Sequence, residues 1–427
     1  MNRNNKPKIW LSSPHMGGSE QTFVNEAFDT NWVAPLGPNV NGFEKDLVQF
    51  TGSGHASALT SGTAAIHLGL VLFGVKPGDV VMCQSFTFSA SANPIKYLGA
   101  EPVFIDSEPE TWNMCPDALR EAIKDQLGKG KNVKAIIPVH LYGMPARMDE
   151  IMAIANEYGI SILEDAAEAL GSHINGKRCG TFGKLGVLSF NGNKIITTSG
   201  GGALISDDKE LIDKSRFLAT QARDNAPHYE HSHIGYNYRM SNIVAGIGRG
   251  QMRVLDERVA QRRANHERYV RFFGENWLAD GGRQTADGGI GDDVGRRSEV
   301  RSQKSEVRSQ RSADSGQRSN TSGIYFLKEL EGYFSNRWLT TVIVNPEETN
   351  GVTREDIRLA LEAENIEARP LWKPMHIQPV FKGAAFYGSG FSEWLFENGL
   401  CLPSGSNLVD EDFERIFEAL SSSLRSR

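Results

Sequence analysis

The chain has 427 residues, a length that predicts a large domain with at least one smaller companion. Hydrophobic residues make up 39% of the chain and the formal net charge is -6, which argues against a general nucleic-acid binder with its strong basic excess. No apolar run approaches the ~20 residues that a membrane helix needs. The first residues, MNRNNKPKIWLSSPHMGG, contain no apolar stretch of signal-peptide length, so we expect a cytoplasmic protein without membrane insertion.

Strand and helix signals alternate from about residue 55 to residue 210. The sequence predicts helices over residues 61–75, 89–100, 116–127 and 147–159, and strands over residues 78–86, 101–107, 133–143 and 160–166. Pro94 is close to the interior of the second helix, where proline is unfavourable. Strands that alternate with helices predict an α/β fold with a mostly parallel sheet covered on both faces.

The C-terminal part of the sequence has a different character. Residues 242–276 are typical of one long, charged helix of the kind that bridges two domains, and residues 337–427 predict a compact α+β unit. The unit consists of the strand RWLTTVIV, the helix TREDIRLALEAEN and a final helix from about residue 410. We therefore expect a large domain over residues 1–241, a connecting helix over 242–280 and a small domain over 324–427.

Residues 281–323 form a low-complexity insert between these parts. The consecutive heptads RSEVRSQ and KSEVRSQ carry one apolar residue each, and a coiled coil needs two. Low hydrophobicity with many serines, arginines and glutamines favours disorder. A basic tether for an anionic partner is the alternative. Because closing a longer surface loop costs little extra entropy, we expect the insert to be dispensable for catalysis.

The cysteines lie far apart and form no CxxC pair. Neither a zinc site nor a disulfide framework is indicated, so reduced, mostly structural thiols and no metal are expected. The four residues are Cys83, Cys115, Cys179 and Cys401.

Three segments of the large domain carry residues suited to chemistry. In TSGTAA, residues 60–65, a strand gives way to a helix whose N-terminus can bind a phosphate, although an ordinary helix cap is an equal alternative. In ILEDAAEALGS, Asp165 ends an apolar strand, where it can cap a helix or hold a protonated ring nitrogen. In LSFNGNKIITTSGGGALIS, residues 188–206, Lys194 lies in a tight link between two strand-like runs.

A phosphate cradle, an acidic residue at a strand end and a recessed lysine are together what pyridoxal phosphate needs. The cradle holds the phosphate, Asp165 keeps the pyridine nitrogen protonated, and Lys194 forms a Schiff base with the aldehyde. The glycines at positions 200–202 let the backbone turn close to the cofactor. The sequence thus predicts a pyridoxal-phosphate enzyme in which Lys194 is covalently engaged.

The order and spacing of several motifs resemble one known family. The motifs are SGTAA, FTFSASANPI, PVFIDSEPETWNM, PVHLYGMPARMDEI, EDAAEALGS, GTFGKLGVLSFNGNKIITTSGGGAL and GYNYRMSNIVAGIGRGQ. The chain is similar to the DegT/DnrJ/EryC1/StrS nucleotide-sugar aminotransferases from about residue 8 to 280 and again from about 335 to the end. The resemblance implies fold type I: a large domain around a mostly parallel seven-stranded sheet, a small C-terminal domain, and a homodimer with shared active sites.

Matched position by position, the resemblance implies that Lys194 bonds to the cofactor and moves protons, and that Asp165 pairs with the ring nitrogen. Glu168 would lie near the ring oxygen, where many members have glutamine or histidine and one branch has glutamate. Members that dehydrate sugars carry histidine in place of the lysine, so Lys194 favours amino transfer.

The resemblance also implies the remaining cofactor contacts. Thr63, Ala64 and Ser189 would hold the phosphate, the first two partly through backbone amides. Phe88 would stack on the ring, although a core aromatic is the commoner fate of such a residue. Asn237, in GYNYRM, would reach the phosphate of the partner subunit.

Two further stretches resemble one branch of the family. SPHMGGSEQTFVNEAFDTNWVAPLGPNVNGFE and NIEARPLWKPMHIQPVF are similar to aminotransferases of the UDP-N,N'-diacetylbacillosamine type. By this similarity His15, Arg369, Trp372 and His376 would line the sugar-nucleotide site. A surface ion pair for Arg369, and packing at the domain interface for Trp372 and His376, are the alternatives.

The branch implies a specific reaction. L-Glutamate would donate its amino group to C4 of UDP-2-acetamido-4-keto-2,4,6-trideoxyglucose, a UDP-linked 4-keto-6-deoxy sugar, for surface glycan or exopolysaccharide synthesis. A 3-keto or dTDP-linked sugar is the first alternative. A non-catalytic regulator that binds pyridoxal phosphate is the second, although such a protein needs no proton-transfer base.

Overall fold

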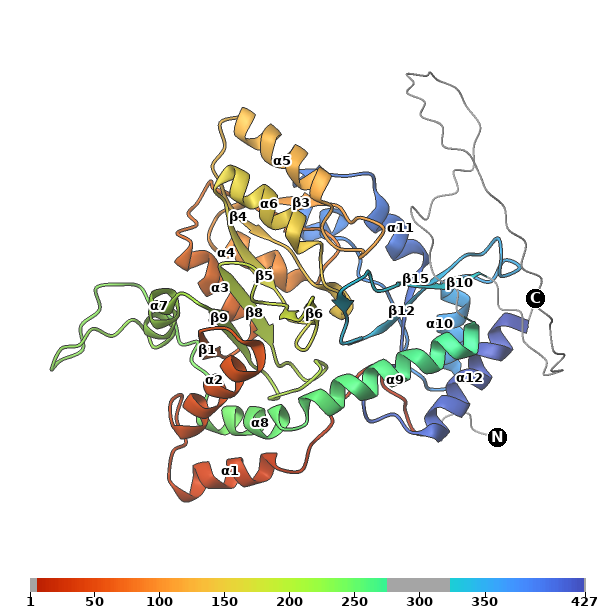
Figure 1. Cartoon of the computed structure of the whole chain (residues 1–427), viewed down its shortest axis with the longest axis horizontal. Coiled ribbons are helices and arrows are strands. Elements are labelled where there is room, and N and C mark those ends of the chain that lie inside the picture. Colours follow the sequence, from red (N-terminus) through yellow and green to blue (C-terminus); the bar gives the residue numbers. More distant parts are fainter. Residues whose placement is uncertain (1–5, 275–322, 426–427) are drawn as a thin grey trace, which may run out of the picture.

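The structure is a computed structural model that describes residues 6–274 and 323–425. It consists of a large α/β lobe and a smaller C-terminal lobe joined by a long helix (Figure 1). The predicted low-complexity insert lies outside the described residues, apart from Gly323. Among the helices of the described ranges, none is long and apolar enough to cross a membrane.

The large lobe is built around one mixed, mostly parallel sheet. Its strand order is β1-β9-β8-β5-β4-β2-β3-β14, and only β9 runs antiparallel to its two neighbours. The strands are β1 (His55–Leu59), β9 (Gly202–Ser206), β8 (Leu185–Ser189), β5 (Ser161–Asp165), β4 (Val133–Ile137), β2 (Val80–Gln84), β3 (Glu101–Ile105) and β14 (Phe386–Tyr387). Seven strands come from the large domain, as the family resemblance implies. The eighth, β14, is a short edge strand from the C-terminal part of the chain.

Helices cover both faces of this sheet because successive strand residues point to opposite sides. In β2, Val81 and Cys83 face one apolar cluster with α3 and α7, whereas Val80 and Met82 face another with α5 and α6. The helices of the large lobe are α1 (Glu20–Asp29), α2 (Pro38–Thr51), α3 (Gly62–Leu72), α4 (Asn93–Tyr97), α5 (Pro116–Gly128), α6 (Met148–Tyr158) and α7 (Lys209–Ala219). The predicted doubly covered sheet is confirmed.

Two predicted elements are shorter in the structure. Instead of one helix over residues 89–100, a 3₁₀ turn η2 (Ser89–Ser91) precedes α4, so Pro94 lies in the first turn of α4, where its missing N–H costs nothing. Instead of a strand over 133–143, β4 ends at Ile137 and a 3₁₀ turn η3 (Leu141–Gly143) follows. Both turns lie at the carboxyl end of the sheet.

The single helix predicted over 242–276 is wrong: the chain forms α8 (Asn242–Met252) and α9 (Leu255–Phe273). The amides of Arg253 and Val254 bond to carbonyls three residues back, which tightens the turn and ends α8. Tertiary packing explains the break. A Cβ at Gly250 would lie 2.7 Å from the Cα of Glu20, so α8 follows α1 closely, while α9 leaves in another direction toward the small lobe (Figure 1).

The small lobe is an antiparallel sheet covered by helices. Its strand order is β10-β12-β15-β13, and its core also receives Tyr269 and Phe273 from α9. The elements are β10 (Ile324–Phe326), β12 (Thr340–Val344), β13 (Arg369–Pro370), β15 (Gly399–Leu402), α10 (Arg354–Ala363), α11 (Phe391–Asn398) and α12 (Asp410–Arg425). A third sheet joins β11 (Tyr333–Phe334) to the hairpin β6 (His173–Ile174) and β7 (Lys177–Arg178), so the chain after residue 323 touches the large lobe before β12.

Candidate active site

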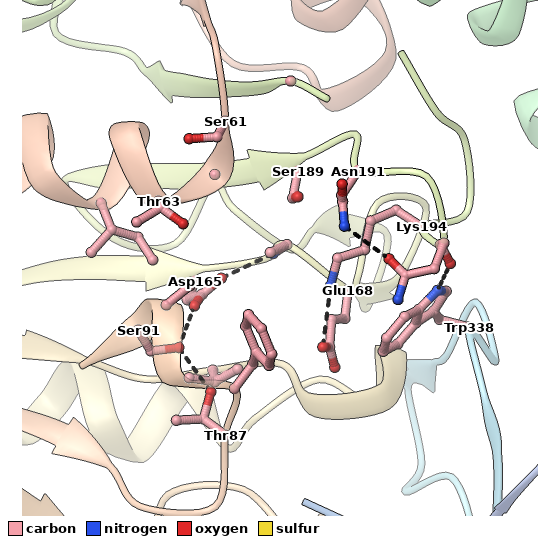
Figure 2. Close-up of a pocket in the computed structure, with 18 of the residues that line it drawn as sticks. Ser61, Thr63, Thr87, Ser91, Asp165, Glu168, Ser189, Asn191, Lys194 and Trp338 are labelled. Atoms are coloured by element: carbon pink, nitrogen blue, oxygen red, sulfur yellow. Dashed lines mark hydrogen bonds and ion pairs between the residues drawn. The ribbon is translucent and has the colours of Figure 1, made fainter. Parts of the chain in front are cut away.

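A cavity of about 280 Å³ opens at the carboxyl ends of β5 and β8, where open α/β sheets bind their ligands. Figure 2 shows Lys194 and Asp165 directed into this space from two sides. Its walls come from the start of α3, the turn after β2, the end of β5 and the β8–β9 link. The lining residues include Ser61, Gly62, Thr63, Thr87, Phe88, Ser91, Asp165, Glu168, Ser189, Asn191, Asn193, Lys194, Trp338 and Trp372.

One end of the cavity suits an anion. Ser61 caps α3 by accepting a hydrogen bond from the Ala64 amide at 3.0 Å, while the first amides of the helix have no partner within it. Thr63 and Ser189 also line the cavity near the start of this helix (Figure 2). A Cβ at Gly202 would lie 2.4 Å from the Gly62 nitrogen, so only glycine lets β9 approach the helix start so closely.

A second part of the cavity carries a negative charge. It comes from Asp165, the last residue of β5, which is 4% exposed. Its carboxylate accepts hydrogen bonds from Ser91 Oγ at 2.7 Å and from the Ala167 amide at 3.1 Å. The Ser91 hydroxyl lies 2.8 Å from that of Thr87. This chain of donors holds a buried carboxylate in one orientation, which is what a carboxylate needs in order to pair with a cationic ring nitrogen.

Lys194 lies in the link between β8 and β9 with its side chain 11% exposed. Its Nζ donates to Glu168 Oε1 at 3.2 Å and lies 4.3 Å from the centre of the Trp338 ring. Glu168 Oε2 accepts the Tyr142 amide at 2.8 Å. Burial raises the pKa of the Glu168 carboxyl, and the neighbouring Lys194 charge partly offsets this. The lysine is therefore recessed and already paired with a carboxylate.

Aromatic rings form the open side of the cavity. Phe88 is 51% exposed and lines the cavity, which excludes the core-aromatic alternative. Its ring centre lies 5.5 Å from that of Trp372, which stacks at 6.2 Å on Tyr142. Phe88 and Trp372 therefore both present aromatic side chains to the cavity.

A second cavity of about 280 Å³ adjoins the first. The two share Asn193, Trp338 and Trp372 as a common wall, and the second also contacts Leu11, Ser12 and Arg369. Arg369 is largely exposed and forms an ion pair with Glu367 at 2.6 Å. The surface ion pair that was the alternative prediction for Arg369 is therefore also present. The arrangement offers room for a substrate that is longer than the first cavity.

The other predicted residues lie away from the first cavity. Ala64 donates its amide to the Ser61 cap, so that amide is already occupied. His15 Nδ1 contacts Ser406 Oγ at 3.1 Å, and His376 stacks on Phe386 with its Nδ1 2.7 Å from Ser85 Oγ. Asn237 is exposed on its own subunit and is not among the residues that line this cavity.

Four residues that the sequence analysis did not single out complete the cavity. Ser91 and Thr87 orient Asp165, Asn193 lies beside the lysine, and Trp338 forms the floor under it. Ser91 and Thr87 lie in the FTFSASANPI motif, which was a usable signal. Trp338 lies 144 positions after Lys194, and no local pattern links them.

The residues fit pyridoxal phosphate. The cofactor is a flat ring with a phosphate at one end, a basic ring nitrogen and an aldehyde, and the cavity offers a helix N-terminus with hydroxyls, a buried carboxylate and a lysine. The close packing of β9 at Gly202 against the backbone of Ser61 and Gly62 holds the start of α3 in place at the phosphate end of the cavity.

Comparisons with known proteins agree with this chemistry. The model of the DegT/DnrJ/EryC1/StrS aminotransferase family matches residues 14–280 and 313–421, so the stretch left unmatched between these two ranges lies within the predicted insert. EpsN of Bacillus subtilis, whose name places it among the pyridoxal phosphate-dependent aminotransferases, is 48% identical over 97% of this chain and 95% of its own length. GDP-perosamine synthase of Caulobacter vibrioides is 34% identical over 97% of this chain and 98% of its own.

A solved structure has the same fold. The crystal structure of a DegT/DnrJ/EryC1/StrS aminotransferase from Brucella abortus superposes with a TM-score of 0.79 at 26% identity, covering 96% of each chain.

Proposed function

The chain belongs to the DegT/DnrJ/EryC1/StrS family and is a pyridoxal-phosphate-dependent aminotransferase, and from this premise we propose its substrates. It transfers the amino group of L-glutamate to C4 of a UDP-linked 4-keto-6-deoxy sugar, UDP-2-acetamido-4-keto-2,4,6-trideoxyglucose. The product would serve surface glycan or exopolysaccharide synthesis.

The amino-transfer part of the proposal rests on one observation: a lysine, a buried carboxylate and a helix N-terminus meet in one cavity that adjoins a second. The choice of a UDP-linked 4-keto sugar rests on the resemblance of residues 13–44 and 365–381 to one branch of the family. The cofactor, when bound, supplies an aldehyde that carries the amino group and a ring that takes up the electron pair of the carbon losing its proton. Asp165, oriented by Ser91, would hold a proton on the ring nitrogen. Thr63 and Ser189 would bind the phosphate at the start of α3.

Lys194 would act both as the amine that binds the cofactor and as the base that moves the proton of the substrate carbon. An ammonium is no nucleophile, so Lys194 must first lose a proton. Glu168 Oε1, 3.2 Å from Nζ, is placed to accept it, and its raised pKa suits this role. Phe88 and the neighbouring rings would cover one face of the site and limit the entry of water.

The second cavity would take the nucleotide end of the sugar substrate. Trp372 stands at the boundary of the two cavities, and Arg369 on the far side offers a guanidinium to a diphosphate. Binding there requires Arg369 to exchange Glu367 for the substrate. His15 and His376 would contribute only if the substrate extends beyond the two cavities.

We further propose that two copies of the chain share their sites. Asn237 is exposed beside the start of α8 and lies outside the cavity of its own subunit. In a homodimer it would reach the phosphate in the partner's cavity.

The test is a direct assay. The purified protein is mixed with pyridoxal phosphate, L-glutamate and the UDP-4-keto sugar, and the UDP-4-amino sugar is sought by mass spectrometry, with Lys194→Ala as the control. Product from the wild type alone supports the proposal. The same assay with a dTDP-linked 3-keto sugar and with a GDP-linked 4-keto sugar tests the rivals, since one relative is named for a GDP-linked product.

The outcomes separate the hypotheses. A spectral change of the cofactor with glutamate but no product from the UDP sugar would retain the aminotransferase and reject this substrate. A cofactor spectrum that glutamate leaves unchanged would favour a non-catalytic binding protein.

A further inference from the structure

The peptide that carries Lys194 is anchored from outside the large sheet. The carbonyl oxygen of Asn193 accepts two hydrogen bonds, one from Ser12 Oγ at 2.7 Å and one from Trp338 Nε1 at 2.7 Å. Ser12 belongs to the N-terminal segment, and Trp338 to the chain just before β12. Two segments that are remote in sequence therefore fix the backbone immediately before the lysine.

Arg262 of α9 ties these anchors together. Its Nη1 donates to the Trp338 carbonyl at 2.5 Å, and its Nη2 donates to Ser12 Oγ at 3.0 Å and contacts the Lys194 carbonyl at 3.5 Å. One guanidinium thus contacts both anchoring residues and the lysine itself.

The charge of Arg262 is not explained by an ion pair. The side chain is 1% exposed, and no carboxylate of the described chain lies within ion-pair distance of it. Burial, with a contribution from Arg258, lowers the pKa of Arg262 to about 9. Burying a charge without a counter-ion is costly, and an apolar side chain of similar volume usually packs there more favourably. The guanidinium is instead satisfied by oxygen acceptors of the two anchoring residues and of Lys194.

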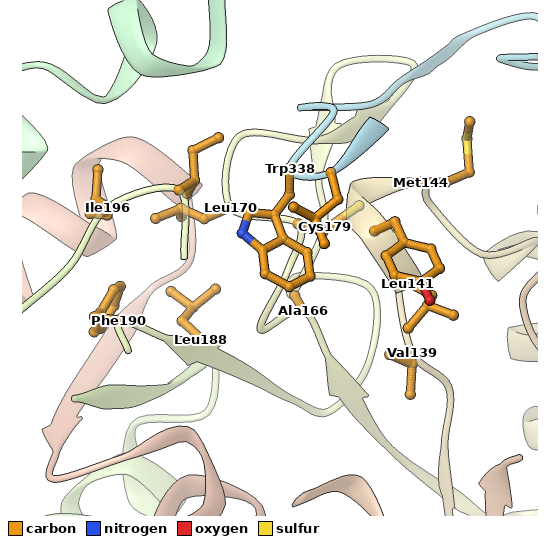
Figure 3. Close-up of a cluster of buried hydrophobic side chains, with 14 of the residues drawn as sticks. Val139, Leu141, Met144, Ala166, Leu170, Cys179, Leu188, Phe190, Ile196 and Trp338 are labelled. Carbon is orange, nitrogen blue, oxygen red and sulfur yellow. The ribbon is translucent and has the colours of Figure 1, made fainter. Parts of the chain in front are cut away.

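Trp338 is buried in the core next to Lys194. Its ring is 1% exposed and points into a cluster with Ala166, Leu170, Cys179 and Leu188 (Figure 3). The ring centre lies 4.3 Å from Lys194 Nζ.

Asn336, two residues earlier, supports the other partner of the lysine. Its Nδ2 donates to the carbonyl of Glu168 at 3.0 Å, and its Oδ1 accepts the Trp338 amide at 2.9 Å. One short stretch, residues 336–338, therefore supports both Glu168 and Lys194.

We propose that Arg262 and Trp338 are positioning residues for Lys194. Arg262 holds the N-terminal segment and the chain before β12 against the link that carries the lysine. The Trp338 ring determines how far the amine extends into the cavity. This inference rests on the proposed function, in which Lys194 is the reacting amine. Reaction of a bound group requires its atoms to lie within a few tenths of an ångström of their productive positions, so loosening the support slows the reaction more than it weakens binding.

The test compares two arginines of the same helix. Arg258 lies one turn before Arg262 and is 4% exposed, but it donates to the Met16 carbonyl and not to the lysine link. The two side chains are similarly buried, although Arg258 also pairs with Glu257 at 3.0 Å, and only Arg262→Met removes the support of the lysine link. Each holoenzyme is measured for the affinity of pyridoxal phosphate, the fraction of cofactor that borohydride fixes to Lys194, the rate of the glutamate-driven spectral change, and the melting temperature.

We expect Arg262→Met to slow the spectral change by about 10- to 100-fold and to lower the fixed fraction, with cofactor affinity changed much less. Arg258→Met should stay within about twofold of the wild type in rate and fixed fraction, because it leaves in place every hydrogen bond that Arg262, Ser12 and Trp338 make around the lysine link. Equal slowing by both variants, or no slowing by Arg262→Met, would overturn the inference.

Trp338→Phe is the second variant, in case Arg262→Met does not fold. It keeps an aromatic ring but removes the N–H that Asn193 accepts and part of the ring volume, so the melting temperature should also fall. Slowing of the spectral change with cofactor affinity close to that of the wild type supports the positioning role, and a wild-type rate contradicts it. A wild-type protein whose cofactor glutamate leaves unchanged would instead refute the proposed function, and the inference would fall with it.

Discussion

Replacing Asp165 by asparagine tests the electrostatic half of the site. Asparagine has nearly the same shape, can still accept the Ala167 amide, and can donate to Ser91 Oγ, which then turns its own hydrogen toward Thr87. The fold should therefore persist. The substitution removes the negative charge that faces the ring nitrogen of the cofactor.

The size of the effect follows from burial. Asp165 is 4% exposed, so water cannot replace the lost carboxylate. Leaving a buried cation without its partner costs roughly 3 to 5 kcal/mol. At about 1.36 kcal/mol per decade, the glutamate-driven spectral change should slow by about 10²- to 10⁴-fold. Ser91→Ala keeps the charge and loses one donor, so it should slow the change by only about tenfold.

Stopped-flow absorbance of the holoenzyme mixed with glutamate measures both rates, and circular dichroism checks that each variant is folded. We expect the rate of the spectral change to be highest in the wild type, lower in Ser91→Ala and lowest in Asp165→Asn. An Asp165→Asn rate within about tenfold of the wild type would refute it, because no buried charge pair would then be contributing.

Two further predictions concern stability and cofactor binding. His266 is buried without a partner for either ring nitrogen among the described residues, and burial together with Arg337 keeps its pKa well below 6.5. The unfolded chain binds a proton below that pH and the folded chain does not, so the unfolding free energy should fall by up to about 1.4 kcal/mol per pH unit below pH 6.5. His266→Phe should remove this contribution to the pH dependence of the unfolding free energy, which urea unfolding at pH 7 and pH 5.5 measures. The same pH dependence in the variant and the wild type would show that His266 is not the group responsible. Gly202→Ala, whose Cβ would lie 2.4 Å from the Gly62 nitrogen, should displace the start of α3, cost about 1–3 kcal/mol and weaken pyridoxal phosphate binding in a fluorescence titration. Gly128→Ala, at the end of α5, whose added Cβ also meets nothing within 4 Å, is its control, and equal affinities in the two variants would argue against the phosphate cradle.

The alternation of strands and helices was predictable because it is a local signal. Apolar runs of strand length between amphipathic stretches mark the sheet, and the structure confirms its helical cover on both faces. The break between α8 and α9 was not predictable, since both sides have helical patterns and the turn at Arg253 and Val254 is imposed by packing against α1. Strand β14 was missed because two residues are too few to show any period.

The site was predictable where residues of one motif act together. Asp165 and Lys194 follow apolar strands, and the structure brings them to one cavity. Trp338 and Arg262 escaped because their contacts with the lysine link arise only from the docking of the small lobe and α9. The predicted role of Asn237 cannot be tested in a single chain, because it requires a contact with the phosphate in a second subunit.

Every step proposed for this enzyme depends on a bond between Lys194 and pyridoxal phosphate. This bond is tested by reducing the holoenzyme with borohydride, digesting it and locating the phosphopyridoxyl group by mass spectrometry. We expect the group on the peptide that contains Lys194, and we expect it to be absent when Lys194→Ala is treated in the same way. Attachment to a different lysine, or complete loss of the cofactor on denaturation after reduction, would contradict it.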